Sequence, residues 1–205
     1  MKFKNLEMTG FKSFSEKTTV LIEKGLTGIV GPNGCGKSNI VEALRWCMGE
    51  NSAKSMRGSG MEDVIFSGTS NRPSKNISEV ALLLDNQEKS GSAQYKEFDE
   101  ISVKRKIEID KGSKYYINDK EVRARDVQTF FADLSTGAHS PSLISQGRIG
   151  QLVTSKPIER KSILEEAAGI SGIHARRQEA ETRLSAAENN LKRADELKKQ
   201  QQKQL

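Results

Sequence analysis

One glycine-rich segment constrains the fold of this 205-residue chain more than any other feature: Gly31-Pro32-Asn33-Gly34-Cys35-Gly36-Lys37-Ser38. Its first and third glycines are separated by four residues and followed by Lys and Ser, which is the pattern of a phosphate-binding loop. The segment before it, Leu26-Thr27-Gly28-Ile29-Val30, reads as a short strand, and residues 38–48 after it carry apolar side chains at helical spacing. We therefore expect a short buried strand, the loop, and a helix that ends at Gly49.

The residue types of this loop are those that binding a nucleotide requires. Glycines let the backbone curl so that its N–H groups point at a phosphate, and the helix start adds a positive end. Lys37 is expected to reach the β- and γ-phosphates of ATP, and the Ser38 hydroxyl to ligate Mg²⁺. A glycine-rich turn with an exposed lysine is the alternative. Further contacts to the nucleotide, through the loop backbone and its neighbours, are expected from Pro32, Asn33, Gly34, Cys35, Gly36 and Asn39.

The rest of the first 155 residues predicts a sheet with helices. Alternating or β-branched apolar residues indicate strands at 3–9, 18–22, 77–84, 101–109 and 114–117. A turn is expected at 10–15 and another at Asn118-Asp119. Residues 51–76 are expected to form loops around a short ordered piece at 61–66. A helix is expected at about 124–134, followed by an apolar strand-like piece at 143–145.

The chain changes character at residue 155. Ser155 and Pro157 are typical of a helix start, and this helix is expected to run to Ala168 and to be broken by Gly169. Beyond it, alanines and leucines recur every seven residues, which predicts one strand of a coiled coil. A solvated single helix is the alternative. We expect two parts, a globular domain at 1–155 and a coiled-coil helix at 156–205.

Charge and composition narrow the kind of partner. The formal net charge is +6 and the isoelectric point is near 9.3, and residues 101–125 contribute eight Lys and Arg against four Asp and Glu. This basic segment suggests an anionic partner, although a lysine-rich strand face that prevents sheet aggregation is the alternative. The chain has no apolar run of eighteen residues and no secretory signal, so we expect a cytoplasmic protein without a membrane span.

Several blocks resemble the N-terminal head half of bacterial SMC proteins, the chromosome condensation ATPases. The blocks occur in the family's order over about residues 1–175, and they are 10–14, the loop with Asn39, 57–58 with 61–66, 144–147 and 165–169. The resemblance implies an α/β fold: an ABC-type P-loop ATPase half-head with a mixed sheet and flanking helices, followed by a coiled-coil helix.

The resemblance also assigns roles to residues outside the loop. Gln146 matches the glutamine that approaches Mg²⁺ and the attacking water, which makes Ser38 and Gln146 the implied metal ligands. Lys12 and Ser13 match a turn near the nucleotide, and Arg57 matches an arginine that brings positive charge to the phosphates. The implied catalytic set is therefore Lys37, Gln146 and Arg57. The implied contacts to double-stranded DNA, made without sequence preference, are Lys104, Arg105, Lys106, Arg123 and Arg125.

The family's other head half has no match in this chain. The signature loop, the second magnesium motif and the switch histidine are absent, so hydrolysis is expected only when a C-terminal head half and a second head complete the site. The implied partners are those two, DNA, and kleisin-type regulatory subunits, at the nucleoid. Three alternatives stay open: the head of an SMC-related DNA-repair ATPase, a P-loop phosphotransferase, and a structural module with a vestigial loop.

Overall fold

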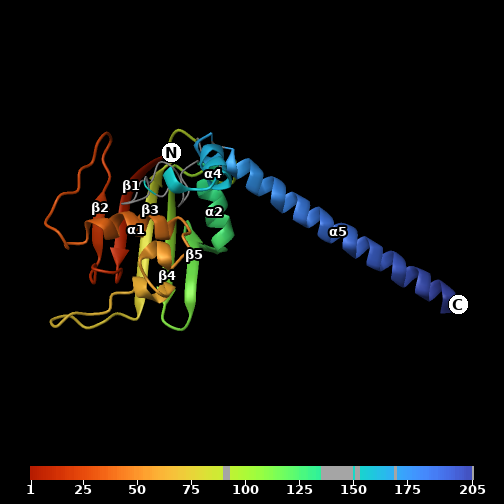
Figure 1. The fold of residues 1–205 in the computed structure, drawn as a ribbon, viewed down its shortest axis with the longest axis horizontal. Helices are drawn as coiled ribbons and strands as arrows, with labels where there is room; N and C mark the ends of the chain where they lie inside the picture. The colour runs from red at the N-terminus through yellow and green to blue at the C-terminus, as the bar shows by residue number, and fades with distance from the viewer. Residues whose placement is uncertain (90–92, 135–149, 151–152, 169, 205) are drawn as a thin grey trace.

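The computed structural model describes residues 1–89, 93–134, 150, 153–168 and 170–204. Its centre is a six-stranded sheet in the order β2-β1-β3-β4-β5-β6 (Figure 1). All five pairings between these strands are antiparallel. The strands are β1 (Lys2–Thr9), β2 (Thr18–Leu21), β3 (Ile77–Asp85), β4 (Glu100–Glu108), β5 (Gly112–Ile117) and β6 (Lys120–Val122).

Alternation of side chains explains why these segments are strands. In β3 and β4 every second residue is buried, because successive side chains point to opposite faces of a sheet. The turn between β5 and β6 has positive φ angles at Asn118 (48°) and Asp119 (60°), the geometry of the tight hairpin that matches strand twist. The sequence predicted this turn but not the strand β6 that follows it.

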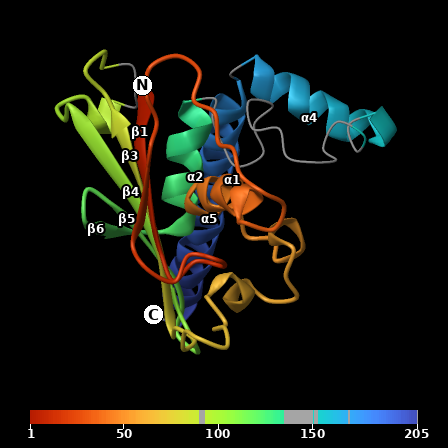
Figure 2. The same cartoon turned by 90° about the vertical axis from the view of Figure 1, so that its left-hand side faces the viewer.

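Two helices cover one face of the sheet (Figure 2). α1 (Lys37–Cys47) packs Trp46 and Cys47 against it, and α2 (Ala124–Asp133) packs Val127, Phe130 and Phe131. These side chains join the inward residues of β1, β3, β4 and β5 in one hydrophobic core. Three short 3-10 turns complete the body: η1 (Lys54–Met56), η2 (Met61–Val64) and η3 (Ala93–Tyr95).

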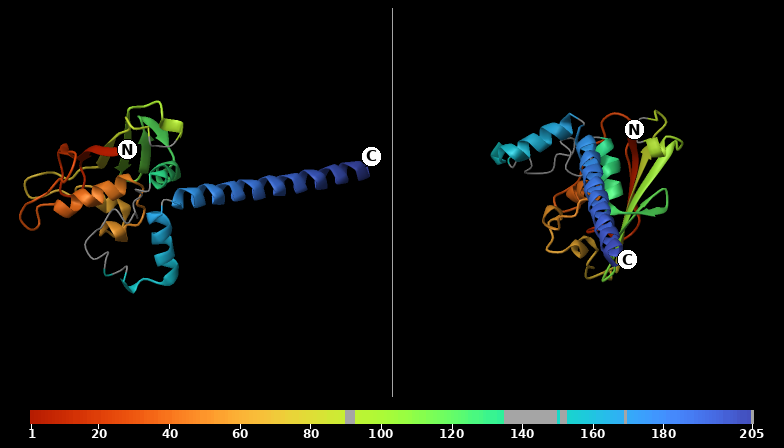
Figure 3. Two further views of the ribbon diagram at one scale, coloured as in Figure 1. Left: turned by 90° about the horizontal axis from the view of Figure 1, so that it is seen from above. Right: turned by 90° about the vertical axis from the view of Figure 1, so that its right-hand side faces the viewer.

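The C-terminal part is helical. α4 (Pro157–Ala167) precedes α5 (Ser171–Gln204), whose first turns lie beside α2 while the remainder projects from the body as a straight arm (Figures 1 and 3). None of the described helices is long and apolar enough to cross a membrane. A strand-and-helix body that carries a P-loop and leads into a long helix confirms the expected fold class.

One predicted element is wrong. Residues 26–30 are not a strand, and Leu26 and Val30 are almost fully exposed. A strand needs a neighbour to satisfy its backbone groups, and no described strand pairs with this segment. The other predicted strands and helices in the described residues are confirmed to within two residues at each end. The predicted strand-like piece at 143–145 and the helix-breaking Gly169 lie outside the described residues.

Candidate functional site

The phosphate-binding loop lies on the surface between β2 and α1. Gly34 and Gly36 have φ angles of +82° and +96°, in the left-handed region that residues with a Cβ adopt only at a cost. A Cβ atom on Gly36 would lie 2.5 Å from the Ser13 hydroxyl oxygen. Glycine at this position therefore permits both the curl of the loop and the close approach of the turn that carries Ser13.

The start of α1 favours an anion. Gly36 is its N-cap residue and offers no side-chain acceptor to the first turn, so the helix start keeps its positive character. Lys37 is the first residue of α1, and its Nζ donates hydrogen bonds to the carbonyl oxygens of Gly31 at 2.7 Å and Pro32 at 2.6 Å. The ammonium group thus lies over the loop. Ser38 is exposed beside it.

The structure brings four of the expected nucleotide-site residues together around one further residue, Glu42. Its carboxylate accepts from Arg57 Nε through one oxygen and from Lys12 Nζ through the other. Asn39 joins the same cluster, because its Nδ2 donates to Ser13 Oγ at 2.9 Å and its Oδ1 accepts from Arg57 Nη2 at 2.9 Å. Cations from two distant segments therefore meet beside the first turns of α1.

Backbone pairing explains how the turn at 10–15 reaches this place. The Lys12 N–H donates to the Val64 carbonyl at 2.7 Å, and the Phe66 N–H donates to the Gly10 carbonyl at 2.8 Å. Gly10 has a φ of +63°, and a Cβ there would lie 2.3 Å from the Ile77 carbonyl oxygen. The turn is therefore fixed to the segment that follows η2, which in turn follows Arg57.

Asp63 stabilises the loop that carries Arg57. Its Oδ2 accepts hydrogen bonds from the Ser59 N–H at 2.6 Å, the Ser59 hydroxyl at 2.8 Å and the Gly60 N–H at 3.0 Å. These bonds, the one from Gly60 foremost, lower the pKa of the Asp63 carboxyl. Asp63 thus fixes the shape of the loop that follows Arg57, a role that the sequence pattern around Asp63 does not reveal.

Glu42 is the central residue of this cluster, and the sequence reasoning did not single it out. Its position, one helical turn after Ser38, places it on the loop-facing side of α1. A single acidic residue in an amphipathic helix is most often a solvated one, so the sequence carried no signal for its burial. Only the approach of Lys12 and Arg57 from elsewhere in the chain shows what its carboxylate contacts.

Arg105 corrects the expected DNA-binding set. It is 2% exposed, and its guanidinium carbon lies 4.5 Å from the Trp46 ring centroid and 4.7 Å from that of Tyr115. Its Nη1 donates to the carbonyl oxygens of Trp46 at 2.9 Å and Glu50 at 2.7 Å. A side chain enclosed in this way has no access to a DNA backbone. Strand alternation was the available signal, because 105 has the parity of the buried 101, 103 and 107.

The other four residues of that set occupy two places. Lys104 and Lys106 lie on the face of β4 opposite to α1, where Lys104 pairs with Asp119 at 3.2 Å. Arg123 and Arg125 lie at the start of α2, where Arg123 pairs with Asp126 at 3.2 Å. The predicted basic segment is therefore divided between the outer sheet face and the helix start.

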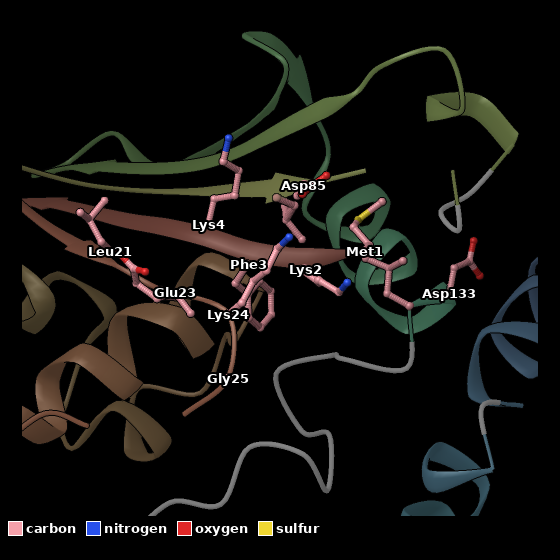
Figure 4. A pocket seen from close by; sticks show the side chains of 13 residues that line it. Met1, Lys2, Phe3, Lys4, Leu21, Glu23, Lys24, Gly25, Asp85 and Asp133 are labelled. Atoms are coloured by element: carbon pink, nitrogen blue, oxygen red, sulfur yellow. The ribbon is translucent and has the colours of Figure 1, made fainter. Parts of the chain in front are cut away.

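A large groove in the described part of the chain lies away from the loop. It has a volume of about 810 Å³ and lies between the start of β1, the segment after β2 and the end of α2. In Figure 4, Asp133 lies apart from Phe3 and Lys24, which appear close to each other in that view. None of the expected site residues that the structure describes lines it. It borders residues 21–25, which lead directly into the exposed segment 26–30.

The residues present fit a nucleoside triphosphate with bound Mg²⁺. Lys37, Lys12 and Arg57 supply positive charge, the uncapped start of α1 supplies oriented N–H groups, and Ser38 supplies the hard oxygen that Mg²⁺ prefers. Cys35 is exposed in the loop. Gln146, the second expected metal ligand, lies outside the described residues.

Comparison with known proteins gives consistent matches. A family model described as "RecF/RecN/SMC N terminal domain" matches residues 2–148. The chain is 56% identical over 197 residues to the chromosome partition protein Smc of Cereibacter sphaeroides and 54% identical over 197 residues to that of Rhodopseudomonas palustris. Each match covers 96% of this chain and 17% of the relative, so the chain spans about one sixth of the length of these proteins.

Solved structures are similar as well. The crystal structure of an Smc head bound to the C-winged helix domain of ScpA has a TM-score of 0.76 and 30% identity, covering 85% of this chain and 54% of that one. The Smc head domain of Pyrococcus yayanosii with a coiled coil and joint has a TM-score of 0.73 and 34% identity, covering 99% and 39%. A third, from work on ATP-driven dimerization of SMC ATPases, has a TM-score of 0.69 and 31% identity, covering 82% and 99%.

Proposed function

This chain belongs to the RecF/RecN/SMC N-terminal domain family, and we propose that it is the ATP-binding half of an SMC-type ATPase head. In this proposal the head acts in chromosome partition in the cytoplasm, at the nucleoid, as the names of the relatives suggest. The observation that carries the proposal is the meeting of Lys12, Ser13, Asn39 and Arg57 beside a phosphate-binding loop at an uncapped helix start.

Each group has a role that follows from its place. The loop N–H groups and the helix start bind the phosphates, and Lys37 turns from the loop carbonyls to the β- and γ-phosphate oxygens. Arg57 and Lys12 add positive charge at the same end of α1. Ser38 holds Mg²⁺, which when bound neutralises developing charge on the phosphates. Gln146 remains a predicted second ligand and water-orienting residue.

The head requires completion by a second segment. Leu26 and Val30 are apolar and almost fully exposed directly before the loop, and the groove beside residues 21–25 is open as well. Apolar surface of this kind indicates a missing packing partner. We assign that place to the C-terminal head half, with a second head of the same kind engaging the nucleotide site. One of the similar solved heads is bound to ScpA, and a kleisin-type subunit is accordingly our expected regulatory partner.

Substitution of Lys37 tests the ATP-binding proposal. Lys37→Ala, in the chain assembled with a C-terminal head half, is expected to lower the affinity for ATP and Mg²⁺ at least about 100-fold, because a charge-assisted contact worth about 3 kcal/mol disappears. Equilibrium binding of a fluorescent ATP analogue measures the change. Lys111→Ala removes an exposed lysine on the β4–β5 turn and serves as the control.

Unchanged affinity in Lys37→Ala would contradict the proposal. Steady phosphate release by the 205-residue chain alone would instead favour the phosphotransferase-like alternative, because that class carries its complete site in one chain.

A further inference from the structure

We propose that Glu42 is a positioning residue that holds Lys12 and Arg57 beside the phosphate-binding loop. The inference rests on the proposed ATP-binding function and names how two of its cations are placed. Glu42 itself does not touch the nucleotide in this proposal. It acts through the two side chains that its carboxylate binds.

The geometry is that of a shared anchor. One carboxylate oxygen of Glu42 accepts from Arg57 Nε, and the other accepts from Lys12 Nζ. The two cations come from segments 45 residues apart in the sequence, one at the turn after β1 and the other after η1. Their common partner lies on α1, five residues after Lys37. The helix that begins the phosphate site therefore also fixes the cations beside it.

Burial makes this anchor strong. The Glu42 side chain is 10% exposed and that of Lys12 is 13% exposed, whereas that of Arg57 is 58% exposed. A carboxylate withdrawn from water needs partners that stabilise its charge, and it holds them more firmly than a surface carboxylate does. Lys12 also donates to the Met56 carbonyl oxygen, which ties it to the segment of Arg57. Lys12 is thus enclosed, and the exposed guanidinium of Arg57 is the group whose direction depends most on Glu42.

The backbone at both cations supports a fixed placement. Lys12 and Arg57 have φ angles of 46° and 56°, a left-handed conformation that costs a non-glycine residue free energy and persists where surrounding contacts enforce it. Asn39, also on α1, accepts from a second Arg57 donor at 2.9 Å. Two α1 side chains therefore determine where the guanidinium points.

Two physical effects of removing the Glu42 charge have opposite signs, which makes the test sharp. A bystander carboxylate near the loop repels phosphate, so its neutralisation would strengthen ATP binding. A positioning carboxylate holds Arg57 and Lys12 in place, so its neutralisation weakens binding. We expect the second outcome: Glu42→Gln lowers ATP affinity about five- to tenfold, the effect of losing one well-placed charge-assisted hydrogen bond.

The first experiment observes Arg57 directly in the nucleotide-free chain. The Arg57 Nε–H proton of the chain, labelled with ¹⁵N-arginine and assembled with an unlabelled C-terminal head half, is expected at a downfield position because it donates to a carboxylate. In Glu42→Gln this resonance moves upfield, and in Glu42→Asp it moves back in part. A resonance that stays in place in Glu42→Gln would overturn the inference, whatever the chain does with ATP.

The second experiment couples Glu42 to Arg57 in ATP binding, with the C-terminal head half supplied. In an Arg57→Ala background, Glu42→Gln is expected to change affinity less than about twofold, because the main positioned group is gone. Glu50→Gln is the matched control, since Glu50 is a buried carboxylate paired with Arg45 at 2.9 Å after the other end of α1. It is expected to leave affinity close to the wild-type value while the thermal midpoint monitors folding in every variant.

The outcomes separate this inference from the proposed function. ATP binding that is lost in Lys37→Ala but unchanged or strengthened in Glu42→Gln would overturn the role of Glu42 alone. A wild-type head that does not bind ATP would overturn the proposed function, and the Arg57 resonance would still decide whether Glu42 positions that side chain.

Discussion

The least ordinary single residue of the body is Arg105, a buried cation enclosed by two aromatic rings and two carbonyl groups at the end of α1. Burial lowers the pKa of its guanidinium, yet an arginine stays protonated at any ordinary pH. Its charge is compensated by ring quadrupoles and by the carbonyl oxygens of Trp46 and Glu50, which lie at the C-terminal end of the helix. Arg105 therefore ties α1 to β4.

Replacement of Arg105 measures how much its contacts between α1 and β4 contribute to the free energy of unfolding. Arg105→Met keeps much of the length of the side chain and is expected to lower the free energy of unfolding by about 2–4 kcal/mol, because the carbonyl oxygens and the stacked rings lose their partner. Urea denaturation gives the change. Lys106→Met, on the opposite face of the same strand, is expected to change stability by less than about 0.5 kcal/mol. Equal effects of the two substitutions would show that Arg105 contributes no more than a surface cation.

Among the secondary-structure elements, the β5–β6 hairpin has a turn whose backbone is under strain. The Asn118 side chain stabilises the turn, since its Oδ1 accepts a hydrogen bond from the Ser102 N–H at 2.8 Å. Asp119 has a φ of 60° and an exposed ion pair with Lys104, and exposed pairs contribute little. The edge strand β6 depends on this turn for its register.

A glycine at position 119 is expected to relieve that strain. Asp119→Gly creates the Asn-Gly pair that such turns prefer and is expected to raise the free energy of unfolding by about 0.5–1 kcal/mol. Asp119→Ala removes the same carboxylate without relieving φ, so it is expected to be neutral or destabilising. Thermal melts of the two variants make the comparison, and a lower midpoint for the glycine variant would contradict the turn assignment.

Across the molecule, the excess of basic residues is distributed unevenly. Charges alternate on the outer sheet face, where Lys104 and Lys114 each pair with a neighbouring carboxylate, and Lys111 on the β4–β5 turn does the same. Arg123 and Arg125 lie at the start of α2, where Arg123 also pairs with a carboxylate, that of Asp126. Of the expected DNA contacts, Arg123 and Arg125 are exposed, whereas Lys104 and Lys106 are half-buried.

We propose that the exposed arginines at the start of α2 contribute to the binding of duplex DNA. The double variant Arg123→Ala/Arg125→Ala is expected to weaken binding to any duplex sequence and to lower the slope of log affinity against log salt by about 2, since two phosphates are no longer neutralised. Fluorescence anisotropy at several salt concentrations measures both. Lys2→Ala/Lys4→Ala removes two exposed cations of β1 as a control, and an equal weakening there would mean that net charge alone governs binding.

Local patterns explain why much of the fold was predictable. Strands β3 and β4, the helix after the loop and the turn at Asn118-Asp119 each follow from a period or a turn signal contained in adjacent residues. The same holds for Lys37, whose place follows from the loop pattern. Arg105 was assigned to DNA on its charge, although the strand period already placed it among buried residues.

Interactions between near neighbours in the chain specify the phosphate-binding loop, the strand alternation and the long final helix, so these features could be predicted from the residues alone. Whether residues 26–30 form a strand depends on tertiary packing, since pairing needs a neighbouring strand and none of the described strands pairs with them. Tertiary packing also settles that Glu42, 30 residues from Lys12 and 15 from Arg57, holds both cations. Such contacts depend on which distant segments pack together, and no local period records that choice.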